Sequence, residues 1–322
     1  MCKVLIIGAG GVGGYLGARM CAAGHDVTFL VRGRRLEQLR RDGLVVDSEV
    51  AGGVWPVATA TAQTVGAEYD YVVIAAKAYH LDEDFIQLLR ALDNGTNHVI
   101  PFMNGLRHML FLERVFGHER TLGGICRISA TLSPDGVVRH LSRIQEFVVG
   151  GRTPSAQRAA GKFVAMAAGS GIDAWVEEDV EATLWTKLVG LAALAASTCL
   201  MRAPVGCISS TIEGRQFMSE ILRETAGVAA AYGYPMPPGD YRTVLGQLTD
   251  QTSGISASML RDLEAGGDTE GDHIIGDLHD RGAAAGLDLP LLRLAKIHLE
   301  AAALRKSRDA GVGERAPSAS GA

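Results

Sequence analysis

A glycine-rich segment directly after an apolar N-terminal run constrains the fold of this chain more than any other feature. Residues 4–7 are all apolar and too few to form a helix, so they predict a buried strand. Gly8, Gly10 and Gly13 follow with the spacing G-x-G-x-x-G, and a helical pattern then covers residues 14–23. A strand, these glycines and a helix, in that order, form the fingerprint of a dinucleotide-binding site.

The fingerprint gives each glycine a different task. Gly8 permits the tight turn, Gly10 lets a pyrophosphate approach the backbone, and Gly13 lets the helix pack close to the strand. The helix N-terminus, which includes Gly11 and Val12, offers N–H groups and the positive end of the helix dipole to phosphates. We therefore expect these five residues to bind a cofactor. The alternative is a glycine-rich turn that binds nothing, and the strand before the motif disfavours it.

The end of the second predicted strand, residues 26–31, indicates which dinucleotide binds. An NAD site usually has an acidic residue here to hold the ribose 2′-hydroxyl. This strand ends in Val31-Arg32 instead. Because an arginine grips a 2′-phosphate as a planar fork, we predict NADP with Arg32 as its ligand. Arg34 and Arg35 either assist or form the solvated start of the next helix.

Length and composition are those of a soluble globular protein. The 322 residues suit two domains, and 47% are hydrophobic and 21% charged. A net charge of −5 gives no reason to expect a nucleic acid or an anionic membrane as a partner. The five cysteines form no C-x-x-C pair, so we predict no metal site and no disulfide framework. Reduced thiols fit a cytoplasmic enzyme.

Two apolar segments have compositions that membrane spans or targeting signals share. The N-terminal run ends at Gly8, within the fingerprint, which argues against a signal peptide. Residues 188–201 form the longest apolar helix candidate, and they are fewer than the ~20 needed to cross a bilayer. This segment therefore predicts a buried helix of a soluble domain.

The order of elements predicts an α/β fold with two domains. Residues 71–76 and 98–102 read as parallel core strands, and residues 123–130, 137–140 and 145–149 as short strands joined partly by an Asp135-Gly136 turn. We therefore expect an N-terminal Rossmann-type, doubly wound sheet with an antiparallel extension over residues 1–178. Helices are predicted at residues 184–201, 214–232, 241–249, 256–265, 273–285 and 289–305, which form a helical substrate domain over residues 179–306. Residues 307–322 are rich in Gly, Ser, Ala and Pro, and we expect a disordered tail.

Three polar segments follow strands of the predicted sheet. Lys77 follows residues 71–76, and Asn104 follows residues 98–102, as the glycine loop follows the first strand. Ligands of open α/β sheets bind at the carboxyl ends of the strands, so these segments should meet in one crevice. Asn104 before Gly105 could equally be an ordinary turn former.

Lysine is rare in this chain, and one lysine occupies an unusual position. Six of the 31 basic residues are lysine, and Lys187 opens the most apolar helix candidate. An amine in a partly dry cleft can exchange a proton near neutral pH, whereas a guanidinium cannot. The alternative is a helix-end lysine whose stem lies along apolar surface. Farther along, Glu270 taken alone reads as an exposed charge.

Taken together, these segments occur in the order of a known family. The fingerprint, Lys77, Asn104-Gly105, Trp185-x-Lys187-Leu188, Ser258-Met259 and Thr269-Glu270 follow one another. In this order the chain resembles the ketopantoate reductase (2-dehydropantoate 2-reductase) family from about residue 3 to residue 304. The family reduces a 2-oxo acid with NADPH, a step of pantothenate biosynthesis.

The resemblance implies a role for each matching residue. Lys187 matches the catalytic lysine and Glu270 the active-site glutamate. Asn104 and Ser258 match residues that hold substrate and cofactor. The remaining matches are Lys77, the cleft lysine beside the cofactor, and Arg32, the arginine of the 2′-phosphate.

One departure from the family affects the substrate. Family members that act on ketopantoate carry asparagines four and eight residues after the catalytic lysine, where this chain has Leu191 and Ala195. At ~100° per residue, both positions lie within ~80° of Lys187 around the helix. A substrate hydroxyl that faces Leu191 would lose its hydrogen bond, at a cost of ~1–3 kcal/mol.

The sequence therefore predicts an NADPH-dependent reductase of a small-molecule 2-oxo acid, either ketopantoate or a more apolar 2-oxo acid or carbonyl compound. Two alternatives stay open. One is a hydroxy-acid dehydrogenase with a different substrate. The other is a redox sensor that binds NADPH and acts through a protein partner, although such a sensor has no need of Lys187 or Glu270. The oligomeric state is also open, with a homodimer as one outcome.

Overall fold

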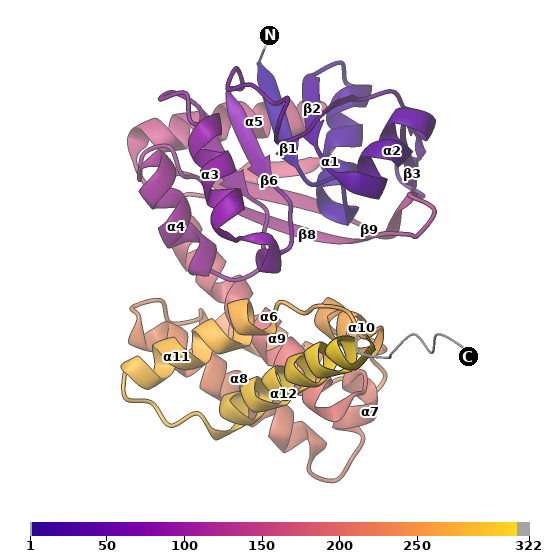
Figure 1. Cartoon of the computed structure of the whole chain (residues 1–322). Helices are drawn as coiled ribbons and strands as arrows, with labels where there is room; N and C mark the ends of the chain where they lie inside the picture. The colour runs from indigo at the N-terminus through magenta and orange to yellow at the C-terminus, as the bar shows by residue number, and fades with distance from the viewer. Residues whose placement is uncertain (1, 314–322) are drawn as a thin grey trace, which may run out of the picture. The chain divides into compact units, whose positions relative to one another are not determined.

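The computed structural model describes residues 2–313 and divides into two compact units (Figure 1). The division falls between Leu184 and Trp185. The boundary expected from the sequence lies after residue 178, and helix α6 (Val180–Met201) is continuous through residue 184. The two units therefore share one helix, and each is described separately below.

A parallel five-stranded sheet forms the centre of the first unit. Its strand order is β5-β2-β1-β6-β7, and every neighbouring pair is parallel. This confirms the predicted Rossmann-type sheet, in which the strand order reverses beside β1. The strands are β1 (Lys3–Ile7), β2 (Asp26–Leu30), β5 (Ala58–Ala60), β6 (Tyr71–Ile74) and β7 (His98–Pro101).

The antiparallel strands form a second sheet, whereas the sequence analysis expected them to extend the first. The two short strands expected at residues 137–140 and 145–149 form one 13-residue strand, β9, which begins at Val138. It pairs with β8 on one side and with β3 and β10 on the other, because its length exposes edges for both. The strands of this sheet are β3 (Leu44–Asp47), β4 (Gly53–Trp55), β8 (Gly123–Leu132), β9 (Val138–Gly150) and β10 (Asp173–Val176).

Alternating residues of the parallel strands build two separate cores. Val4 and Ile6 of β1 face one core, and Leu5 and Ile7 face the other. The first core includes side chains of α1, α5 and β9, and the second includes side chains of α3 and α4. Because both faces of the sheet are covered, residues 4–7 of β1 and 72–74 of β6 are all apolar and buried. The helices of this unit are α1 (Gly11–Ala22), α2 (Gly33–Asp42), the short η1 (Ala78–His80), α3 (Glu83–Leu92), α4 (Arg107–Phe116) and α5 (Pro154–Gly169).

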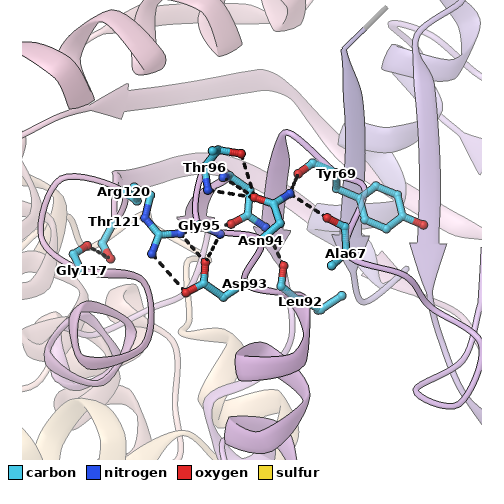
Figure 2. A network of polar contacts seen from close by, with 11 residues as sticks. Ala67, Tyr69, Leu92, Asp93, Asn94, Gly95, Thr96, Gly117, Arg120 and Thr121 are labelled. Carbon is cyan, nitrogen blue, oxygen red and sulfur yellow. Dashed lines mark hydrogen bonds and ion pairs between the residues drawn. The ribbon is translucent and has the colours of Figure 1, made fainter.

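A network of polar contacts joins three segments, residues 67–69, 92–97 and 117–121, at the amino ends of β6 and β7 (Figure 2). The Asn94 side-chain amide donates to the carbonyl oxygens of Ala67 and Tyr69, at 2.7 and 3.1 Å, and its oxygen accepts from the backbone of residues 96 and 97. Beside it, the Arg120 guanidinium forms an ion pair with Asp93. This pairing holds the pKa of the Asp93 carboxyl below its usual value.

The second unit is entirely helical, as predicted. Helix α8 packs against α7, α9, α11 and α12. Helix α7 was not predicted from the sequence. In place of the one helix expected over residues 273–285, the structure has a π-helical turn, η2, followed by α11. The helices are α7 (Val205–Ser209), α8 (Gly214–Ala231), α9 (Pro238–Leu248), α10 (Ser258–Glu264), η2 (Asp272–Gly276), α11 (Asp277–Ala284) and α12 (Pro290–Gly313).

Helix α6 is longer than the sequence analysis expected. It has 22 residues, so it is long and apolar enough to cross a membrane, and the length argument made from residues 188–201 was wrong. However, 61% of its most apolar 18-residue window is buried inside the protein. This burial is typical of the core helix of a soluble protein, which passes the same test of length and composition.

Helix α12 begins at a buried carboxylate. Glu224 of α8 accepts hydrogen bonds from the backbone N–H groups of Leu291 and Leu292, at 3.0 and 2.9 Å. These donors have no partner within the helix, so the carboxylate satisfies them and favours the helix dipole. The helix then continues to Gly313, so residues 307–313 of the expected disordered tail are helical. Residues 314–322 lie outside the described residues.

The ion pair of Asp93 and Arg120 makes stability depend on pH. Because its pKa is lowered in the folded protein, Asp93 stabilises the fold above the ordinary aspartate pKa of about 3.9, and this contribution is lost as the pH falls through the lowered value. We expect Asp93→Asn to reduce the free energy of unfolding by about 1–3 kcal/mol at pH 7, and by progressively less below pH ~4. Denaturant titrations at several pH values measure the difference. Glu37→Gln, at an exposed site, should show no such trend, and a constant difference for Asp93→Asn would contradict the assignment.

Candidate functional site

Four neighbouring parallel strands of the first unit end at the same level, because their last residues are paired with one another. Leu30 of β2 is paired with Ile7 of β1, Ile7 with Ile74 of β6, and Ile74 with Pro101 of β7. The segments that follow these residues therefore emerge side by side at one edge of the sheet. They carry Arg32, the glycine loop from Gly8, Lys77 and Asn104.

The glycine loop has the shape that the fingerprint requires. Gly8 has a φ of +99°, which L side chains rarely adopt, and its N–H donates to the Leu30 carbonyl at 3.1 Å. A Cβ at Gly13 would lie 2.2 Å from the Gly8 oxygen, so only glycine permits this approach. A Cβ at Gly10 would have no atom within 4 Å. The loop thus presents open space above Gly10, where the fingerprint expects a pyrophosphate.

The N-terminus of α1 is suited to an anion. The first hydrogen bond within the helix runs from Gly14 N–H to the Gly10 oxygen, at 2.8 Å, which leaves the preceding N–H groups outside the helical pattern. Within the described residues, no side chain caps this helix and no acidic residue lies in its first turn. With the open space above Gly10, this arrangement fits the pyrophosphate of a dinucleotide.

Arg32 lies beside a histidine that the sequence analysis missed. Arg32 is exposed, directly before α2, and its Nη2 lies 3.4 Å from Nδ1 of His80. His80 ends η1, three residues after Lys77. A guanidinium beside an imidazole is a suitable pair of donors for a phosphate group. The signal that could have found His80 is its position in the segment that follows β6, next to the end of β2.

Arg34 and Arg35 are not merely the solvated start of a helix. Arg34 donates to the Pro134 oxygen at 2.5 Å. Arg35 donates from Nε to the Ala9 oxygen at 2.8 Å and from Nη1 to the Gly136 oxygen at 2.7 Å. Burial lowers the pKa of Arg35 to about 10. Two of the three guanidinium nitrogens of Arg35, Nε and Nη1, thus donate to backbone carbonyls of the glycine loop and of the turn between β8 and β9.

Lys77 and Asn104 are partly buried at the edge described above. Lys77 has an extended backbone directly before η1. Asn104 precedes Gly105, which has a φ of +85°. The backbone at Gly105 therefore fits a turn, and the partly buried Asn104 lies at the carboxyl end of β7.

Helix α6 of the second unit has a partly exposed stripe that includes Lys187. The partly exposed positions after Trp185 are Thr186, Lys187, Gly190, Leu191, Leu194 and Leu200, whereas Ala195 is only 1% exposed. Leu194, seven residues after Lys187, lies closer to the line of Lys187 than Ala195 does, at ~20° against ~80°. The accessible apolar neighbours of Lys187 are therefore Leu191 and Leu194.

The Lys187 ammonium makes no hydrogen bond or ion pair with any residue that the structure describes. It is the only charged group between Trp185 and Met201. Trp185, two residues earlier, stacks on Tyr232 and Tyr234 at 5.4 and 5.7 Å between ring centroids, and the Arg281 guanidinium lies 5.7 Å from its ring. These contacts fix the first turns of α6 while leaving the amine available.

Ser258 and Glu270 occupy the second unit as well. Ser258 is the first residue of α10, and the preceding N–H, of Ala257, donates to the hydroxyl of Thr198 on α6 at 3.4 Å. Glu270 is 5% exposed, so its reading as an exposed charge was wrong. It lies two residues before the π-helical turn η2, and such turns often occur at functional sites.

The structure thus brings the candidate residues into two groups. The glycine loop, Arg32, Lys77 and Asn104 lie at one edge of the parallel sheet in the first unit. Lys187 and Leu191 lie on one stripe of α6, and Ser258 is joined to that helix through Ala257 and Thr198, in the second unit.

Comparisons with protein families match nearly the whole described chain. The family described as Ketopantoate reductase PanE/ApbA matches residues 4–153. The family described as Ketopantoate reductase PanE/ApbA C terminal matches residues 179–299. The two matches follow the two units of the structure, in the same order.

Known proteins of similar sequence and structure agree with these matches. An uncharacterized oxidoreductase of Bacillus subtilis, YkpB, is 35% identical over 302 residues, which cover 92% of this chain and 98% of that protein. The structure of a 2-dehydropantoate 2-reductase from Geobacter metallireducens is 26% identical, with a TM-score of 0.83 over 93% of this chain and 99% of that one. A D-mandelate dehydrogenase, solved with NADH and anilino(oxo)acetate, has a TM-score of 0.85 over 95% and 99% of the two chains; at 19% identity it shows the shared fold alone.

Proposed function

The chain belongs to the ketopantoate reductase family, whose members are oxidoreductases that act on CH–OH or C=O groups with a nicotinamide cofactor, and we propose that it is an NADPH-dependent reductase of a 2-oxo acid. The observation that carries this proposal is Lys187. It is a partly exposed amine on an apolar helix with no ion-pair partner among the described residues. The resemblance of the sequence to the family implies that it matches the catalytic lysine.

The roles of the residues follow from the charge that develops during reduction. When bound, NADPH would supply a hydride, that is, the hydrogen and the electron pair of the new C–H bond at the carbonyl carbon. Negative charge grows on the carbonyl oxygen, and the Lys187 ammonium stabilises it by a hydrogen bond and then transfers a proton to it. Ser258 and Asn104 hold the polar end of the substrate. Glu270 orients the substrate or Lys187.

The cofactor residues divide between the pyrophosphate and the 2′-phosphate of the dinucleotide that the chain is proposed to hold. The N–H groups from Gly10 to Gly13 would donate hydrogen bonds to the pyrophosphate, since the space above Gly10 is open. Arg32, with His80 beside it, would hold the 2′-phosphate of NADP. Lys77 would lie beside the cofactor at the end of β6.

The substrate is proposed to be more apolar than ketopantoate. The accessible neighbours of Lys187 on α6 are Leu191 and Leu194, which offer no hydrogen bond to a substrate hydroxyl. An apolar wall favours an alkyl or aryl group by ~0.8 kcal/mol per buried methylene. The anilino(oxo)acetate bound by the D-mandelate dehydrogenase is an aryl-substituted 2-oxo acid, so an aryl 2-oxo acid is a suitable first probe.

The proposal includes a cytoplasmic location and an assembly that is either monomeric or homodimeric. It also competes with two alternatives. A hydroxy-acid dehydrogenase would use the same residues in the oxidative direction. A sensor that only binds NADPH would show no turnover with any substrate. An assay of NADPH oxidation by the purified protein, with a panel of 2-oxo acids that includes ketopantoate and an aryl analogue, distinguishes an enzyme from a sensor.

The first prediction for this site concerns the choice of cofactor. NADPH should bind more tightly than NADH, because Arg32 can pair with a phosphate and not with a hydroxyl. Arg32→Ala should remove about a 10–100-fold preference, the range expected for hydrogen bonds to charged groups. Titration calorimetry with both cofactors measures this ratio. Arg41→Ala, at an exposed position of α2, should keep it, and equal affinities in the unmodified protein would contradict the NADP assignment.

The second prediction concerns catalysis by Lys187. Lys187→Ala should lower kcat by ~10²–10⁴-fold, the usual range for a positioned acid, and leave the affinity for NADPH nearly unchanged. Lys187→Arg should also be impaired, because a guanidinium retains its proton. Lys162→Ala removes an exposed lysine and serves as the control. Loss of folding or of cofactor affinity in Lys187→Ala would assign a structural role to this residue.

The third prediction concerns the wall beside Lys187. Leu191→Asn should raise the ratio of kcat/KM for ketopantoate over an analogue that lacks the hydroxyl, by about 3–10-fold, as expected for one hydrogen bond of ~0.5–1.5 kcal/mol. Ala195→Asn is a poorer test, because Ala195 is buried and an amide there would need new partners. A strong preference of the unmodified enzyme for ketopantoate would show that other groups bind the hydroxyl.

A further inference from the structure

Arg35 joins the glycine loop to the second sheet. Its side chain, on the first turn of α2, forks between the Ala9 oxygen at 2.8 Å and the Gly136 oxygen at 2.7 Å. Ala9 lies inside the glycine loop, and Gly136 lies in the turn between β8 and β9. One guanidinium therefore links two segments that are 127 residues apart in the sequence.

The bond to Ala9 constrains the next residue of the loop. The Ala9 carbonyl and the Gly10 N–H belong to one planar trans peptide and point in opposite directions. When Arg35 holds the carbonyl, the Gly10 N–H is directed away from the guanidinium. A charged donor also polarises this peptide, which strengthens its N–H as a donor to an anion. The position of Arg35 thus determines how the loop enters the N-terminus of α1.

A loop of this composition needs such a restraint. Gly8, Gly10 and Gly11 lose more conformational freedom on ordering than other residues would. Without an anchor, the loop would have to order when the ligand binds, and that cost would reduce affinity. Arg35 orders it in advance, with charge-assisted bonds in a partly buried setting.

The turn whose Gly136 oxygen accepts a hydrogen bond from Arg35 is itself held by several contacts. The Ser133 N–H donates to the Val137 oxygen at 2.9 Å, and Gly136 has a φ of +91°. Gln38 of α2 adds a bond to the Pro134 oxygen at 3.2 Å. On the other side of the loop, a Cβ at Gly11 would lie 2.4 Å from the Ala130 oxygen of β8. The hairpin of β8 and β9 therefore supports the glycine loop at two points.

The positive charge of Arg35 also favours the binding of an anion at the glycine loop. Although burial lowers its pKa to about 10, the guanidinium stays protonated at neutral pH. Its Nη2 is buried, and no described residue accepts a hydrogen bond from it. A positive charge beside the loop favours an anion there and takes no part in recognising a 2′-phosphate.

We propose that Arg35 is a positioning residue for the pyrophosphate of the dinucleotide, and that through it the hairpin of β8 and β9 sets the affinity for NADPH and NADH alike. This inference rests on the proposed function only in that a dinucleotide binds at the glycine loop. It assigns Arg35 a role different from that of Arg32, which discriminates between the two cofactors.

Two fragments of the cofactor separate these roles. ADP-ribose has the pyrophosphate and lacks the 2′-phosphate, whereas adenosine 2′-monophosphate has the 2′-phosphate and lacks the pyrophosphate. Calorimetry should show that Arg35→Met weakens ADP-ribose binding at least tenfold and changes the affinity for adenosine 2′-monophosphate less than threefold. Arg32→Met should give the reverse pattern. Arg34→Met is the matched control, because Arg34 bonds to the same turn but not to Ala9, and it should change neither affinity more than threefold.

Arg35→Lys keeps the charge but not the fork, and it should weaken ADP-ribose binding by less than Arg35→Met does. If circular dichroism shows that Arg35→Met is unfolded, Arg35→Lys decides the matter by the same contrast between fragments. Equal weakening of both fragments, or an unchanged affinity for ADP-ribose in folded variants, would overturn the inference while leaving the proposed function intact. Failure of the unmodified protein to bind either fragment would overturn both.

Discussion

The close approach of α1 to its neighbours is the constraint on which the first unit depends. A Cβ at Gly13 would meet the Gly8 oxygen, one at Gly17 would lie 2.2 Å from the Phe29 ring, and one at Gly11 would meet β8. Any of these methyl groups would push the helix outward, away from the strands. Since the helix N-terminus faces the proposed pyrophosphate, the same glycines that close the core also place the phosphate-binding N–H groups.

Much of the fold could be predicted because its signals are local. The apolar runs of β1, β6 and β7 and the helical periodicity of the second unit lie in short stretches of sequence. The second sheet was not predicted as such. Its strands β3, β4 and β10 have only three or four residues each. β3 and β10 pair with β9, and β4 pairs with β3, through contacts between residues distant in the sequence that no local pattern encodes.

The candidate site also contains some residues that local sequence places and others that only long-range contacts place. Residues placed by strand ends, such as Lys77 and Asn104, follow from the topology of a parallel sheet. Glu270 could not be placed, because its burial depends on packing within the second unit. His80 and Arg35 were missed as partners for a similar reason, since the atoms they contact, Arg32 Nη2 and the Ala9 oxygen, are distant in the sequence.

The π-helical turn η2 sets a limit on the length of its segment. Such a turn accommodates one residue more than an α-helical turn does. If one residue of Asp272–Gly276 were deleted, the chain could continue as a regular α-helix, and Glu270 would rotate by about 100° relative to α11. Substitutions in this segment keep the direction of Glu270, whereas a deletion would aim it at a different neighbour. The extra residue thus acts as a spacer that determines the orientation of a buried carboxylate.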